Sequence, residues 1–202
     1  MSPAVAFGDF DECHSILLAS GTLSPLETFE AELGVSFKHK VEANHVIRPE
    51  QVFCRYLSSG PKDKKIRAVY SNRDNESMLV EVGSLLLQAV DDLAQGGVLV
   101  FFTSYSTLKN HVFHWKKRKH RIWQQLEDVA EVFLENGVKG SAEFNQLLEQ
   151  FNAQCLKSKA ILLAVCRGKI SEGIDFADDA ARIVMTIGIP YPAAMGTIRG
   201  LN

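Results

Sequence analysis

Short apolar runs alternate with amphipathic stretches along most of the chain. Residues 98–102, 160–165 and 183–189 are continuous apolar runs of strand length. A run of this kind between turn-forming residues is typical of a strand buried on both faces of a parallel sheet. Weaker runs predict three further short strands, at residues 15–19, 52–57 and 132–134.

Stretches with helical periodicity separate these predicted strands. In residues 76–94, one apolar stripe is formed by Leu79, Val82, Leu86, Ala89 or Val90, and Leu93, as on a helix that packs against a sheet. The same spacing predicts helices at residues 26–33 and 141–155, and a helix after residue 104 that carries Leu108, Val112 and Trp115 inward.

Turn and cap residues mark the ends of these helices. Ser24 followed by Pro25 is a favourable helix start, and Gly34 is expected to end that helix. Hydroxyl residues after the run at 98–102 are N-cap candidates for the next helix. Strands that alternate with helices form βαβ units, so we predict an α/β fold with a parallel, doubly wound sheet.

The composition is that of an ordinary globular protein. The chain has 202 residues, is 46% hydrophobic and 23% charged, and carries a formal net charge of −2. A nucleic-acid partner would therefore need a local basic patch. Two clusters are candidates: Lys62, Lys64, Lys65 and Arg67, and the run Lys116, Lys117, Arg118, Lys119, His120 and Arg121. A solvated loop and a favourable helix C-terminus are sufficient explanations of these clusters, and a phosphate-contacting patch stays open as the alternative.

The residues that bind metals are scattered. The four cysteines include no C-x-x-C pair, which argues against a zinc or iron–sulfur site in this chain. His111 and His114 lie three residues apart without cysteine or glutamate nearby, so we expect surface side chains and no metal site. No apolar stretch reaches the ~18–20 residues of a membrane span, and the start does not resemble a signal peptide.

The strand predicted at 160–165 is followed by a loop rich in functional groups. Glycines there let backbone N–H groups approach a phosphate, and Arg167 and Lys169 supply positive charge. Asp175 could accept a hydrogen bond from a ribose or orient an arginine. Ligands of open α/β sheets bind at such loops, although a polar connection that binds nothing is an equally simple interpretation of the loop alone.

Four stretches, in this order and spacing, resemble motifs of the XPD-like superfamily 2 iron–sulfur DNA helicases. ASGTLSP at residues 19–25 resembles motif III, and FFTSY at 101–105 stands at the place of motif IV. AVCRGKISEGIDF at 164–176 resembles motif V, and EANHVI at 42–47 favours the branch of the Fanconi anaemia group J helicases. The resemblance covers nearly the whole chain.

The resemblance implies a RecA-like domain of the P-loop NTPase type, the second motor domain of a helicase. It implies that residues 1–22 are the last strand and motif III of the first RecA-like domain. Residues 23–202 would be the second domain, incomplete at its C-terminus. The cofactor would be ATP with Mg²⁺, and the iron–sulfur cluster is expected outside this chain. The partners would be single-stranded or forked DNA and the missing first domain, in the nucleus.

The resemblance also assigns three groups of site residues. Motif III, with Ser20, Gly21 and Thr22, would couple the ATP state to DNA binding. The ATP- and DNA-facing residues of motif V are Arg167, Gly168, Lys169, Ser171, Glu172, Gly173 and Asp175. Possible DNA contacts in motif IV are Thr103, Ser104 and Tyr105.

Three helicase patterns are absent from the sequence. It has no G-x-x-x-x-G-K-[ST] phosphate loop, no D-E-A-H-like box and no Q-x-x-G-R-x-x-R of motif VI. We therefore predict that this chain alone does not hydrolyse ATP. Two functions stay open: part of an ATP-dependent DNA helicase, or a non-catalytic fragment that binds DNA or protein partners. An unrelated α/β nucleotide-binding enzyme is a third, and the joint presence of SGTLSP and CRGKISEGIDF counts against it.

Overall fold

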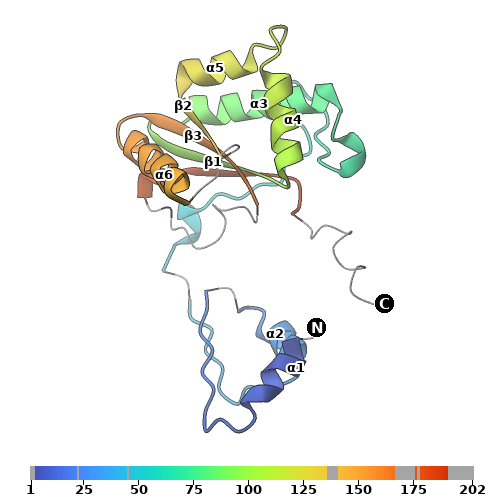
Figure 1. Ribbon diagram of the computed structural model, residues 1–202, viewed down its shortest axis with the longest axis vertical. Helices are drawn as coiled ribbons and strands as arrows, with labels where there is room; N and C mark the ends of the chain where they lie inside the picture. The colour runs from blue at the N-terminus through green and yellow to red at the C-terminus, as the bar shows by residue number, and fades with distance from the viewer. Residues whose placement is uncertain are drawn as a thin grey trace. The chain divides into compact units, whose positions relative to one another are not determined.

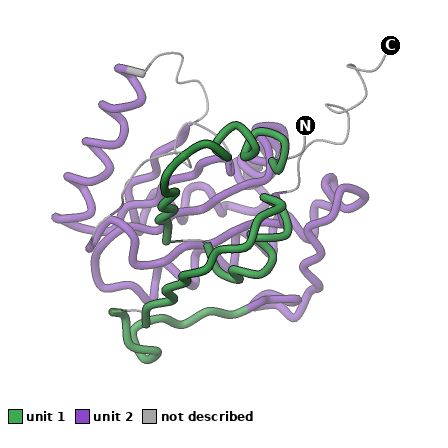
Figure 2. Tube along the Cα trace, turned by 90° about the horizontal axis from the view of Figure 1, so that it is seen from below, with its two compact units in different colours: residues 1–55 green, residues 56–202 purple. Residues whose placement is uncertain are grey.

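The structure is a computed structural model of the 202-residue chain. It describes residues 3–21, 23–44, 46–135, 141–166, 176 and 178–190. The chain divides into two compact units, Met1–Arg55 and Tyr56–Asn202, which Figure 2 colours green and purple. All strands that the structure describes belong to the second unit.

The first unit consists of short helices joined by irregular segments. Its elements are α1 (Pro3–Phe7), η1 (Gly8–Phe10), α2 (Leu26–Leu33) and η2 (Pro49–Gln51). The helix predicted at residues 26–33 is confirmed, and Gly34 ends it in the left-handed conformation, with φ 69°. The predicted cap is wrong, because Pro25 occupies the N-cap position and the Ser24 hydroxyl instead donates to Oε1 of Glu42.

The strands predicted at residues 15–19 and 52–57 are not formed. Both segments are irregular, and Leu17, Phe53 and Tyr56 are 92%, 83% and 86% exposed. A strand is stable only when its backbone N–H and C=O groups pair with a neighbouring strand. The described part of the first unit contains no such neighbour, so an apolar run alone does not produce a strand.

The second unit is built on a four-stranded parallel sheet. The strands are β1 (Gly96–Phe102), β2 (Glu131–Leu134), β3 (Lys159–Val165) and β4 (Ile183–Ile187). Their order across the sheet is β2-β3-β1-β4. β1 pairs with β3 along its full length and with β4 from Val98 onward. The strands predicted at 98–102, 132–134 and 160–165 are confirmed, and the run at 183–189 is a strand as far as Ile187.

Helices cover both faces of this sheet, which confirms the doubly wound architecture (Figure 1). One face is covered by α3 (Glu76–Asp91), α4 (Tyr105–Trp115) and α5 (Ile122–Val129), and the other by α6 (Ser141–Cys155). Along β1, Val98 and Val100 face the first group and Leu99 faces α6. The chain crosses the sheet from β1 to β2 and returns to β3, so right-handed crossovers place α4–α5 and α6 on opposite faces.

The predicted helices are confirmed, and α1 and α5 are two further α-helices among the described residues. α3 ends at Asp91 rather than at residue 94. Of its predicted stripe, Leu79, Val82, Leu86 and Val90 are buried, whereas Leu93 lies beyond the end of the helix and is partly buried. α5 was not predicted, although Ile122, Leu126 and Val129 follow helical spacing. None of the described helices is long and apolar enough to cross a bilayer.

Trp115 joins α4 to α3 inside the core. Its side chain is completely buried, and its Nε1 donates to the backbone oxygen of Leu79 over 2.7 Å. Gly83 of α3 makes this approach possible, since a Cβ there would lie 2.6 Å from Trp115 Nε1 and 2.8 Å from Cγ2 of Ile122. The glycine therefore sets how closely the three helices pack.

Candidate functional site at the carboxyl edge of the sheet

The carboxyl ends of the four strands form one edge of the sheet. Thr103 follows β1, Glu135 follows β2, Cys166 follows β3 and Gly188 follows β4. Ligands of open parallel sheets bind beyond this edge. Because β1 and β3 are neighbours, the structure places the residues predicted for motif IV beside the strand that leads into motif V.

Thr103, Ser104 and Tyr105 begin α4. The backbone N–H of Thr107 donates to Oγ of Ser104 over 3.2 Å, which confirms the predicted hydroxyl cap. The hydroxyls of Thr103 and Ser104 lie 3.4 and 2.9 Å from that of Thr107. These hydroxyls therefore order the start of the helix, and their contact with DNA stays a prediction.

Glu135 connects the ends of three adjacent strands. Its side chain is 2% exposed, Oε2 accepts from the backbone N–H of Val165 over 2.8 Å, and Oε1 accepts from the Tyr105 hydroxyl over 2.9 Å. β2 ends one residue earlier, so the carboxylate supplies an acceptor to β3 beyond the end of β2. Burial and, second, the hydrogen bond to Glu135 raise the pKa of Tyr105 to about 12.

Glu135 is not among the residues predicted from the sequence. The available signal is a carboxylate directly after a short apolar strand, at the edge where ligands of parallel sheets bind. Its partners are 30 residues away along the chain in both directions, and no local pattern identifies them.

Replacement of Glu135 by alanine is expected to lower the free energy of unfolding by about 1–3 kcal/mol, because the buried N–H of Val165 loses this acceptor. Glu135→Gln keeps an acceptor oxygen and should lose less. Urea unfolding of both variants, followed by circular dichroism, measures the difference. Equal stability of the alanine variant and the parent would contradict a structural role for the carboxylate.

Most of the predicted ligand-binding residues lie outside the described part of the chain. These are Thr22, Arg167, Gly168, Lys169, Ser171, Glu172, Gly173 and Asp175. Ser20 and Gly21 are described, and both are exposed in an irregular segment of the first unit. The roles of all these residues stay predictions.

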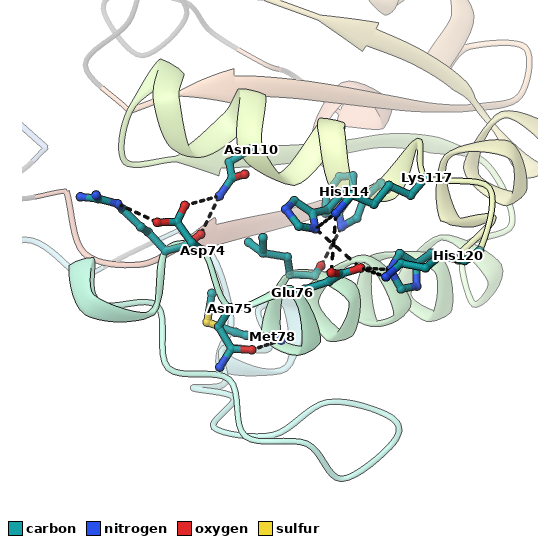
Figure 3. Close-up of polar contacts among 12 residues, drawn as sticks. Asp74, Asn75, Glu76, Met78, Asn110, His114, Lys117 and His120 are labelled. Carbon is teal, nitrogen blue, oxygen red and sulfur yellow. Dashed lines mark hydrogen bonds and ion pairs between the residues drawn. The ribbon is translucent and has the colours of Figure 1, made fainter.

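The longer basic cluster forms the connection between α4 and α5, which we call the cationic turn (residues 116–121). Part of it converges on Glu76 at the start of α3, and Figure 3 shows Lys117 and His120 directed at this carboxylate. Nζ of Lys119, Nε2 of His120 and Nζ of Lys117 lie 2.5, 2.6 and 3.6 Å from its oxygens. The hydrogen bonds from Lys119 and then His120 lower the pKa of Glu76 to about 2.

The shorter basic cluster lies on a loop held by a buried carboxylate. Ser59 pairs with Lys65 as an isolated antiparallel bridge, and Glu81 of α3 accepts from the backbone N–H of Lys62 over 2.6 Å. Glu81 is completely buried, whereas the cationic residues of the cluster are all exposed. Their side chains are therefore available to solvent, and a phosphate contact stays a prediction.

The prediction that both histidines of α4 lie on the surface is wrong for His111. Its side chain is 1% exposed, and its ring centroid lies 5.0 Å from that of Phe102 and 5.6 Å from that of Trp115. Burial lowers the pKa of His111 to about 4. Within the described ranges, no three His, Cys, Asp or Glu side chains are grouped so as to hold a metal ion.

Several known proteins are similar to this chain in sequence. The family model described as Helicase C-terminal domain matches residues 87–198. The chain is 40% identical over 198 residues to the Fanconi anemia group J protein homolog of Gallus gallus, covering 95% of this chain and 15% of that protein. It is 36% identical over 182 residues to the Regulator of telomere elongation helicase 1 homolog of Drosophila mojavensis, covering 90% and 18%. The chain thus spans under a fifth of the length of either relative.

A solved structure named XPD_Helicase shares the fold. It matches 89% of this chain and 29% of its own with a TM-score of 0.52 and 24% identity. This likeness and the doubly wound parallel sheet show that the fold is RecA-like. The family model covers more than half of the chain, from within α3 to beyond β4. The chain therefore belongs to the helicase C-terminal domain family.

Proposed function

We propose that this chain supplies the second motor domain of an ATP-dependent DNA helicase that acts in DNA repair and genome maintenance. One observation supports this above all: in a chain of the helicase C-terminal domain family, the motif V sequence directly follows β3. At that edge of the sheet, Glu135 already links the end of β3 to Tyr105 of motif IV.

In this proposal, ATP with Mg²⁺ is held between this domain and a first RecA-like domain. The first domain supplies the phosphate loop and the acids that bind Mg²⁺, which this sequence lacks. Arg167 and Lys169 offer positive charge to phosphates, and Asp175 communicates the ATP state to the DNA-facing side. Motif III, which would end the first domain at residue 22, couples the ATP state to DNA binding. The family's iron–sulfur cluster would bind outside this chain.

The proposed partner is single-stranded or forked DNA, and the proposed compartment is the nucleus. One relative is named a regulator of telomere elongation helicase and another a Fanconi anemia group J protein, and telomeres are nuclear. These names support the proposal.

A chimera tests the proposal. This chain would replace the matching segment of the Drosophila mojavensis relative, which would supply the first domain and everything beyond residue 202. We expect single-stranded DNA to stimulate ATP hydrolysis by the folded chimera, whereas the 202-residue chain alone shows no turnover. A folded chimera that binds DNA without hydrolysing ATP would favour the non-catalytic alternative.

In the same chimera, Asp175→Ala is expected to abolish unwinding while the melting temperature stays within a few degrees of the parent. A carboxylate in a ligand-binding loop after a strand is placed for function rather than for packing. Asp128→Ala, at an exposed position of α5, is the matched control and should unwind normally. If Asp175 only capped a turn, its loss would cost about 1 kcal/mol of stability and spare unwinding. Unwinding rate and melting temperature of one preparation separate these outcomes.

A further inference from the structure

The cationic turn borders a depression whose charged lining residues are all cationic, while Glu127, outside the lining, accepts from Nε1 of Trp123. This depression has a volume of about 400 Å³, and four of its lining side chains are cationic: Lys116, Lys117, Arg118 and Arg121. Two tryptophans and a glutamine complete the lining, without any carboxylate. A chain of net charge −2 thus gathers a strong local positive field at one place.

Intramolecular ion pairs hold the turn without neutralising all of it. Glu76 is engaged by Lys117, Lys119 and His120, which fixes one side of the turn against α3. Arg118 and Arg121 are exposed, and neither forms an ion pair with any residue in the described ranges. Their guanidinium groups therefore keep their full charge toward solvent.

Arg121 also occupies an unfavourable backbone conformation. Its φ is 57°, in the left-handed region where glycine and asparagine are favoured. This residue caps the N-terminus of α5, and no side chain makes a capping hydrogen bond there. An arginine held at such a position points to a role for its charge outside packing.

The aromatic ring beside the cationic turn indicates which kind of anion would bind there. Nζ of Lys116 lies 4.3 Å from the ring centroid of Trp123, and that indole is only partly buried. Single-stranded nucleic acid is recognised by cationic groups that follow the phosphates and by aromatic rings that stack on bases. An acidic peptide would use the cations but has no general use for the indole.

We propose that the cationic turn is a phosphate-binding contact for single-stranded nucleic acid, additional to the carboxyl edge of the sheet. The 11 residues of α4 separate the two places, which amounts to about 16 Å along its axis. A DNA strand bound at both places would lie along the surface of the domain over that distance. This inference deepens the proposed function, because it assigns a second contact for the same DNA.

The test uses the 202-residue chain and the fluorescence anisotropy of a labelled oligothymidine of about 15 nucleotides. Arg118→Gln/Arg121→Gln is compared with Lys38→Gln/Lys157→Gln, which removes the same charge at exposed positions outside both basic clusters. We expect the arginine variant to bind more weakly and to lose about 1.4 from the log–log salt slope, about 0.7 per contact. An equal loss in both double variants, or no binding by the parent, would overturn the proposal.

A single substitution separates binding from folding. Arg121→Gly removes the charge and relieves the left-handed backbone, so the melting temperature should be unchanged or higher while affinity falls. Arg121→Lys should restore affinity. Polyglutamate serves as competitor, and displacement of the oligonucleotide at equal charge concentration would assign the turn to acidic proteins instead. The assay needs neither ATP nor the first domain, so its result is independent of the chimera.

Discussion

Replacement of Trp115 by alanine should lower the free energy of unfolding of the second unit by about 3–5 kcal/mol. The indole is completely buried between α3 and the sheet, 6.3 Å from the Phe102 ring between centroids. Its loss leaves a cavity that Gly83 cannot fill, and it leaves the Leu79 oxygen without the bond from Nε1.

Urea unfolding followed by circular dichroism measures this loss, with Trp123→Ala as the control of the same residue type. Trp123 is only partly buried and lies beside the cationic turn, so its replacement should cost clearly less. Similar losses for both variants would mean that Trp115 does not organise the contact between α3 and α4.

Acidification from about pH 6.5 to pH 4 should destabilise the fold by about 3 kcal/mol through His111 alone. Burial lowers the pKa of this histidine from 6.5 to about 4, so the folded chain keeps it neutral until the pH approaches 4. The unfolded chain binds a proton there, and stability therefore falls as the pH falls. Below pH 4 both states are protonated, and this residue causes no further loss.

The matched variant is His111→Met, which removes the titrating group and retains an apolar side chain. The Thr107 oxygen that accepts from Nδ1 over 2.8 Å also faces the helical N–H of residue 111, so it keeps a donor. His114, whose pKa burial also lowers, and Glu76, which titrates at lower pH, remain in both proteins. The difference between the two stability–pH curves therefore isolates His111. Parallel curves would contradict a buried neutral imidazole.

Local periodicity predicted the central elements well. The apolar runs of β1 and β3 and the stripe on α3 are long, regular and bounded by turn residues, and the structure confirms them. The motif sequences predicted the helicase family, which the comparisons confirm. These features succeed because a strand buried on both faces and an amphipathic helix record their burial directly in the order of their residues.

Prediction from local sequence pattern failed where the structure of a segment depends on a neighbouring segment. The runs at 15–19 and 52–57 are apolar enough for strands, but the described part of the first unit provides no strand to pair with them. α5 was missed because its eight residues follow a run of six basic residues, and such a run is typical of a solvated surface. His111 reads as a polar surface residue, and only the packing of α4 against β1 buries it.

The sequence by itself determined the α/β class, the order of the central elements and the family. Only the tertiary structure decided that Glu135 bridges Val165 and Tyr105, that Gly83 admits Trp115, and that Glu76 contacts Lys117, Lys119 and His120. The physical reason is one of distance along the chain. Periodicity reports which face of an element is buried, whereas hydrogen bonds and close contacts between residues 30 or more apart exist only once the sheet order has brought them together.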